Sequence, residues 1–205
     1  MATPRTRQTL LLRIRTEGDE HSWAEFVELY TPLLYSFALK RGLQPADAKD
    51  TVQEVMRALA RALRNFEYDP ARGTFRSWLY TVTRREIGRI LKKNARQPLS
   101  GGSEIVATLD RTPDPSEERD WDLDYRLQMF EWACTRARDE FNPTHWRAFE
   151  QTALHDRPAA EVAEELGLTP GAVYIAKSRI VNRIRAIIHS VAAETWELDL
   201  RPPES

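Results

Sequence analysis

The sequence has a single cysteine, Cys134, and only eight glycines among its 205 residues. One cysteine excludes an internal disulfide, and the absence of a Cys-x-x-Cys pair argues against a zinc site. Scarce glycine and few β-branched runs favour a mostly helical chain. Next to Trp132 and Ala133, Cys134 is expected to be a half-buried helix residue. The apolar run at 10–12 is too short for a signal peptide or a membrane span, so we expect a cytoplasmic protein without membrane insertion.

The sequence also lacks the patterns of common catalytic sites. Its four histidines show no metal-ligand spacing, and no Gly-x-Ser-x-Gly motif occurs. The glycine-rich stretch at 100–103 has no following lysine, which argues against a phosphate-binding loop. We therefore expect no enzyme and no cofactor or metal, and an enzyme that uses the acidic helices is a distant alternative.

Charge is distributed unevenly along the chain, although the net charge is only −1. Residues 1–97 hold 18 Lys and Arg against 11 Asp and Glu, whereas residues 98–140 hold 5 against 11. A basic first part and an acidic middle part indicate separate surfaces with separate partners.

Apolar residues recur at spacings of three and four along most of the chain, which is the helical period. This pattern predicts helices over 21–41, 45–64, 75–95, 119–139 and 143–155. We predict an all-α protein made of two small helical domains joined by an extended linker. The expected parts are a first domain at 7–97, a linker at 98–118, a second domain at 119–192 and a tail at 193–205.

Residues 159–178 have the pattern of a helix-turn-helix. Ala163 is small enough for a second helix to cross above it, and Gly167 suits a left-handed turn that ends a helix. Thr169 and Pro170 then have the N-cap and first-turn chemistry of a new helix. Four basic residues and no acidic residue follow before position 194: Lys177, Arg179, Arg183 and Arg185. This favours DNA binding, and a plain helical hairpin with a basic solvated face is the alternative.

The helix expected at 75–95 has a basic stripe. Its members are Arg85, Arg89, Lys92 and Arg96, with Arg84 and Lys93 on either side and Thr81 and Thr83 next to them. Phe66, Tyr68 and Arg72 lie in the loop that precedes this helix. Cations next to aromatic rings suit unpaired bases and their phosphates. Phe75, Trp78 and Leu79 are expected to belong to the core. The alternative for the arginines is that they only form a soluble surface.

The helix expected at 45–64 has a polar side opposite its apolar residues. Asp47, Asp50, Gln53, Glu54 and Arg57 share this side. Ordinary solvated helices look the same, so the pattern alone indicates no partner.

Together these segments resemble a bacterial RNA polymerase sigma factor of the sigma-70 family, in its extracytoplasmic-function group. The resemblance covers about residues 7 to 190. It is carried by DAKDTVQEVMRALARAL at 47–63, GTFRSWLYTVTRREIGRILKK at 73–93 and the hairpin at 159–185. It implies a region 2-like helical bundle, a linker, and a region 4-like helix-turn-helix domain. The implied function is promoter-specific initiation of transcription, without catalysis.

The resemblance also implies roles for single residues. Those implied to bind the clamp helices of the largest subunit of core RNA polymerase are Asp47, Asp50, Gln53, Glu54 and Arg57. Those implied to melt and capture the minus-ten element as single-stranded DNA are Phe66, Tyr68, Arg72, Thr81, Arg84, Arg85 and Arg89. Those implied to read duplex DNA at the minus-thirty-five element are Thr169, Gly171, Tyr174, Lys177, Ser178, Arg179 and Arg183. An anti-sigma factor is a further candidate partner.

A stand-alone regulator that binds duplex DNA without polymerase is the main alternative. It would account for the hairpin at 159–185 but not for the first domain. A gel shift separates the two, because the regulator binds an operator alone and a sigma factor needs the core enzyme.

Overall fold

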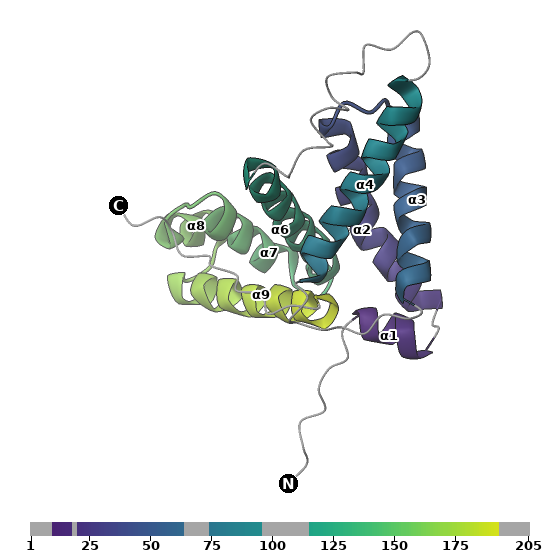
Figure 1. Cartoon of the computed structure of the whole chain (residues 1–205). Helices are drawn as coiled ribbons and strands as arrows, with labels where there is room; N and C mark the ends of the chain where they lie inside the picture. Colours follow the sequence, from purple (N-terminus) through teal and green to yellow (C-terminus); the bar gives the residue numbers. More distant parts are fainter. Residues whose placement is uncertain (1–9, 18–19, 64–73, 96–114, 193–205) are drawn as a thin grey trace. The chain divides into compact units, whose positions relative to one another are not determined.

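The computed structural model describes residues 10–17, 20–63, 74–95 and 115–192, and the elements in these ranges are helices only (Figure 1). The predicted all-α fold class is therefore confirmed. No helix in these ranges is both long enough and apolar enough to cross a bilayer.

The chain divides into two compact units, Met1–Gln128 and Met129–Ser205. The division falls inside helix α6, which spans Pro115–Arg138. Most of the linker expected at 98–118 lies outside the described residues, so the domain boundaries proposed from the sequence stay predictions.

The first unit is a bundle in which α3 contacts both α2 and α4, while α1 lies against α2 and α3 (Figure 1). These helices are α1 at Leu10–Glu17, α2 at Glu20–Lys40, α3 at Pro45–Leu63 and α4 at Phe75–Ala95. The bounds of α2, α3 and α4 agree with the sequence prediction to within one residue. Gly42, with a φ of 84°, takes the left-handed conformation in the turn that follows the end of α2.

Aromatic side chains fill the core of this unit. Phe26 and Tyr30 of α2 meet Phe75 of α4 edge to face, with centroid distances of 6.1 and 5.7 Å. The predicted core residues Phe75 and Leu79 are buried, but Trp78 is only half-buried. Burying aromatic faces of this size is a main source of stability for a small domain.

The second unit contains the remainder of α6 and four further elements. These are α7 at Pro143–Phe149, the π-helix η2 at Glu150–Leu154, α8 at Ala159–Leu166 and α9 at Pro170–Val191. The sequence predicts one continuous helix over 143–155. The structure confirms this to within one residue, and in the last five residues the backbone widens to π geometry with hydrogen bonds five residues back.

The turn between α8 and α9 is built as its residues predict. Gly167 has φ 65° and ψ 32°, the left-handed conformation that ends α8. The hydroxyl of Thr169 accepts a hydrogen bond from the amide of Ala172 at 3.1 Å and so caps α9. Ala163, Val162 and Val173 are buried in one cluster with Ala148 of α7. The predicted crossing over a small residue at position 163 is therefore confirmed.

Candidate functional site

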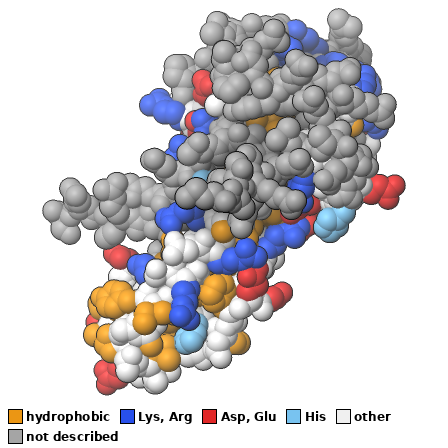
Figure 2. Space-filling view, turned by 90° about the horizontal axis from the view of Figure 1, so that it is seen from below, with side chains coloured by type: hydrophobic (Ala, Val, Ile, Leu, Met, Phe, Trp, Pro, Cys, Tyr) orange, Lys and Arg blue, Asp and Glu red, His pale blue; other side chains and the backbone are white. Residues whose placement is uncertain are grey.

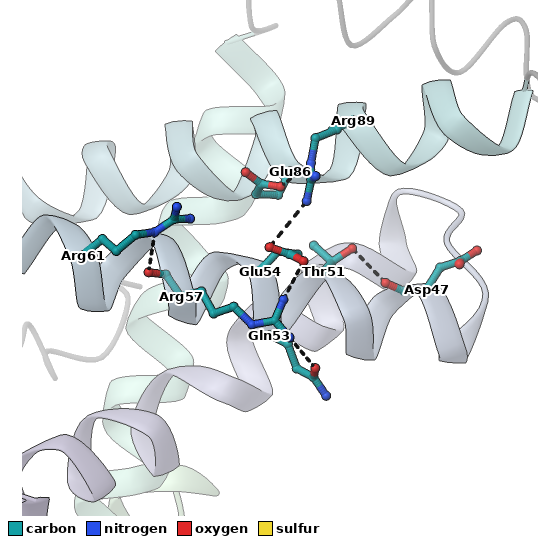
Figure 3. Close-up of polar contacts among 8 residues, drawn as sticks. All are labelled: Asp47, Thr51, Gln53, Glu54, Arg57, Arg61, Glu86 and Arg89. Carbon is teal, nitrogen blue, oxygen red and sulfur yellow. Dashed lines mark hydrogen bonds and ion pairs between the residues drawn. The ribbon is translucent and has the colours of Figure 1, made fainter.

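The polar side of α3 carries all five side chains proposed for polymerase binding. Figure 3 shows four of them, Asp47, Gln53, Glu54 and Arg57. Asp50, Gln53 and Arg57 are exposed, while Asp47 and Glu54 are partly buried. Arg57 donates to Glu54 at 2.6 Å and to Gln53 at 3.1 Å, so it orders two of its neighbours on the same helix.

A cleft of about 280 Å³ separates this side of α3 from α4. Its lining residues are Asp47, Asp50, Gln53, Glu54 and Arg57 of α3 and Arg89, Ile90, Lys93 and Asn94 of α4. Asn94 donates to Asp47 at 2.8 Å, and Arg89 lies 3.6 Å from Glu54. The sequence assigned Arg89 and Glu54 to different surfaces, whereas the structure brings them together in one cleft.

The basic stripe of α4 is less uniform than its sequence predicts. Arg85 is exposed and has no carboxylate partner among the described residues. Arg89 is 61% exposed but donates to Glu86 at 2.8 Å in addition to its contact with Glu54. In the described part of the face drawn in Figure 2, blue Lys and Arg side chains lie next to red Asp and Glu side chains. Acidic neighbours therefore offset part of the positive charge of α4.

Arg84 and Thr83 differ from the prediction for this helix. Arg84 is only 13% exposed, and its Nε lies 3.6 Å from the carboxylate of Glu117 on α6. Thr83, expected beside the basic face, is fully buried, and its hydroxyl donates to the carbonyl of Leu79 at 2.7 Å. With its hydroxyl satisfied in this way, a threonine can pack among apolar residues.

Thr81 of α4 is exposed and donates to the carbonyl of Ser77 at 2.9 Å. Phe66, Tyr68, Arg72 and Arg96 lie outside the described residues. The position of Glu117 beside the α4 cations was not predicted from the sequence. The sequence does carry a signal for this contact. The acidic run at 117–124 includes an aromatic residue at position 121.

Burial also changes the chemistry of Tyr80, one turn before Arg84. Its hydroxyl donates to Glu117 at 3.3 Å. Burial, and then the negative charge of Glu117, raises the pKa of Tyr80 to about 12. Tyr80 therefore remains a neutral hydrogen-bond donor at any physiological pH.

The second unit exposes the start of α9. Tyr174 is 64% exposed and Ile175 is 56% exposed, which leaves two large side chains of α9 in solvent. Thr169, Gly171, Ser178 and Arg179 are exposed as well. The exposed residues come from the first three turns of α9, the part of a recognition helix that contacts base edges.

Two of the cations proposed for this surface have partners within the unit. Lys177 donates to the backbone carbonyl of Thr152, in the middle of the π-helix, at 3.0 Å. Arg183 makes two hydrogen bonds of 2.6 Å to Glu140. Hydrogen bonding from Arg183 holds the pKa of Glu140 below its usual value, and the same contact raises the pKa of Arg183. The positive surface of α9 is therefore smaller than its sequence suggests.

Residues 26–97 match the family model of sigma-70 region 2. The matched segment runs from Phe26 of α2 to just past the end of α4, so it contains the α3 polar side, the cleft and the α4 stripe. No group of three or more His, Cys, Asp or Glu side chains is arranged to hold a metal in the described ranges. The matched part of the chain is thus similar to region 2 of the sigma-70 family.

Proposed function

We propose that this protein is an extracytoplasmic-function sigma factor that binds core RNA polymerase and directs it to specific promoters. The observation that carries the proposal is the match of residues 26–97 to sigma-70 region 2 on a bundle whose α3 presents a polar side. In this proposal the chain has no catalytic role and needs no cofactor.

The α3 side binds the clamp helices of the largest polymerase subunit. Its exposed residues Asp50, Gln53 and Arg57 offer an acceptor, an amide and a cation for such a contact. The hydrogen bonds from Arg57 hold Gln53 and Glu54 in place before the partner arrives, which lowers the entropy lost on docking.

The α4 stripe engages the minus-ten element once its bases separate. Extruding one base costs a few kcal/mol, and stacking on aromatic side chains returns about 1–3 kcal/mol per base. Thr81, Arg85 and Arg89 supply exposed polar and cationic groups on α4 for the phosphates. Phe66, Tyr68 and Arg72 are proposed to form the base pocket, on the strength of the sequence alone.

The start of α9 reads duplex DNA at the minus-thirty-five element. Tyr174 and Arg179 extend from the first three turns of α9 toward solvent, where they can contact bases and phosphates. Lys177 and Arg183 were proposed for the same surface. In the structure both are held by partners within the unit, so their binding to DNA requires an exchange of partners.

Reconstitution with bacterial core RNA polymerase tests this function. We expect the purified chain to form a complex with the core enzyme and to make it start transcription at defined positions on fragmented genomic DNA. Binding of an operator by the chain alone, with no effect on polymerase, would instead identify a stand-alone regulator. Transcription starts unchanged by the chain would refute the proposal.

Three variants distinguish polymerase binding from promoter selection. Asp50→Lys is expected to reduce capture of core polymerase. Asp139→Lys, which makes the same charge change at an exposed site in the second unit, is expected to leave capture intact. Tyr174→Ala is expected to preserve capture and reduce promoter selection. Equal capture by the Asp50 and Asp139 variants would remove the assignment of α3 to polymerase binding.

A further inference from the structure

The first half of α6 is an acidic helix that contacts basic residues of α2 and α4 within the first unit. Glu117 lies 3.6 Å from Arg84 and 3.7 Å from Arg41. The remaining pairs are Asp122 with Arg76 at 2.7 Å and Asp124 with Lys40 at 2.7 Å. Three carboxylates thus pair with four cations, which lie in α2, in α4 and in the turn that follows α2.

Aromatic contacts anchor the same segment between these ion pairs. Trp121 is fully buried and meets Phe37 of α2 edge to face at 4.8 Å, with Tyr80 of α4 at 5.7 Å. One turn later, the hydroxyl of Tyr125 lies 3.3 Å from that of Tyr30. Aromatic anchors flanked by acidic residues make the segment complementary to this face in both shape and charge.

The contact divides the basic side of α4 into a covered and an open part. Arg76, Tyr80 and Arg84 recur every four residues and so form one stripe along α4. Beneath the α6 segment, the side chains of Arg76 and Arg84 are 23% and 13% exposed. The neighbouring stripe, which carries Arg85 and Arg89, is exposed to solvent.

We propose that residues 115–128 are a reversible cover on α2 and α4, and that their release adds Arg76 and Arg84 to the nucleic-acid surface of α4. The proposal rests on the function proposed above, because it assigns the covered arginines to phosphate binding. The acidic segment occupies the arginines that an incoming phosphate backbone would neutralise.

Two features of the contact favour release over permanent packing. The indole Nε1 of Trp121 is buried with no hydrogen-bond partner among the described residues, which weakens the docked state. Lys40, in the pair with Asp124, is 56% exposed, so salt screens that pair. The contact of this segment with α2 and α4 is therefore weak enough for a polyanion to compete for the same arginines.

Zero-length carbodiimide crosslinking of the full chain measures docking, because it joins Lys40 to Asp124 only when the two are in contact. We expect this crosslink in the wild-type protein, and we expect its yield to fall as a short single-stranded oligonucleotide of mixed sequence is added. No crosslink without oligonucleotide, or a yield that the oligonucleotide leaves unchanged, would overturn the cover.

A matched pair of double variants then tests the covered arginines. E117Q/D122N removes two of the contacting carboxylates, whereas E118Q/D120N removes two exposed ones from the same helix with the same change in charge. We expect only E117Q/D122N to lose crosslink yield and to bind the labelled oligonucleotide more tightly. Its slope of log affinity against log salt should steepen by about 1.4, since each phosphate contact to a single strand contributes about 0.7.

Other results of this experiment count against the proposal. Equal gains in affinity for both double variants would show a general effect of charge. Loss of the crosslink without a gain in affinity would show that α6 covers no nucleic-acid surface. The proposed sigma function is judged separately, by the transcription starts of the wild-type chain, and it stands if the cover alone fails.

Discussion

The guanidinium of Arg89 on α4 lies 3.6 Å from the carboxylate of Glu54 on α3 (Figure 3). Arg89 was assigned to DNA and Glu54 to polymerase, so this pair joins the two proposed surfaces across one cleft. A partner that engages Glu54 would release part of the charge of Arg89, and in that way polymerase binding would favour DNA binding.

Arg85 and Arg89 are expected to differ as phosphate contacts. In complexes with polymerase and promoter, Arg85→Ala should lower the salt slope of open-complex formation by about 0.7 to 0.9, the value of one contact. Arg89→Ala should lower it less, because Glu86 and Glu54 already neutralise that side chain. Open-complex formation measured at several salt concentrations checks this, and identical slopes for the wild type and the Arg85 variant would contradict it.

Ala163 should not tolerate a larger, charged side chain. It is 2% exposed, in contact with Val162, Val173 and Ala148, so Ala163→Glu places a carboxylate in an apolar cluster. We expect a loss of more than about 3 kcal/mol in the free energy of unfolding of the second unit, from overpacking and charge burial together. Ala160→Glu, on the exposed side of α8, is the control. Equal thermal melts for both variants would refute the packing.

Thr169 is expected to stabilise α9 through its hydroxyl. Because that hydroxyl accepts from the amide of Ala172, Thr169→Ala should cost about 1 kcal/mol of unfolding free energy. Thr169→Ser keeps the acceptor and should cost much less. Denaturant unfolding of both variants checks this, and a serine variant as unstable as the alanine variant would argue against the cap.

Glu140 should make stability depend on pH. Its folded-state pKa is lowered by Arg183, so the carboxylate stabilises the fold above its unfolded-state pKa. That stabilisation is lost as pH falls through the lower, folded-state pKa. Glu140→Gln should therefore cost less than about 1 kcal/mol at neutral pH, as for exposed pairs, and nothing in strong acid.

The control for Glu140 is Asp139→Asn, at the exposed position beside it. Urea unfolding at both pH values provides the measurement. A deficit of the Glu140 variant that persists unchanged in strong acid would rule out the ion pair as its source.

Cys134 should react slowly with thiol reagents. Burial, and then the charges of Glu131 and Glu150, raises the pKa of its thiol to about 12. Because the thiolate is the reactive form and each pKa unit changes its fraction tenfold, we expect reaction with a disulfide reagent at least about 100-fold slower than in denaturant. Comparable rates in the folded and denatured states would contradict this environment.

Local chemistry made much of the fold predictable. The bounds of α2, α3 and α4 follow from apolar spacing. The turn between α8 and α9 follows from Gly167 and Thr169, since a left-handed turn and an N-cap depend on adjacent residues only. The polar side of α3 was also foreseeable, because residues three and four apart share one helix face.

What the sequence by itself determined, then, is every described helix except α1, together with the all-α class and the polar and basic faces that single helices present. Only the tertiary structure decided which charges on those faces remain available. Arg84 lies beneath Glu117, from 33 positions further along the chain, and Arg183 is bound by Glu140. Such pairs join residues that are distant in sequence. Helical periodicity predicts which face of a helix carries a side chain, but it does not predict which residue of another helix will contact that side chain.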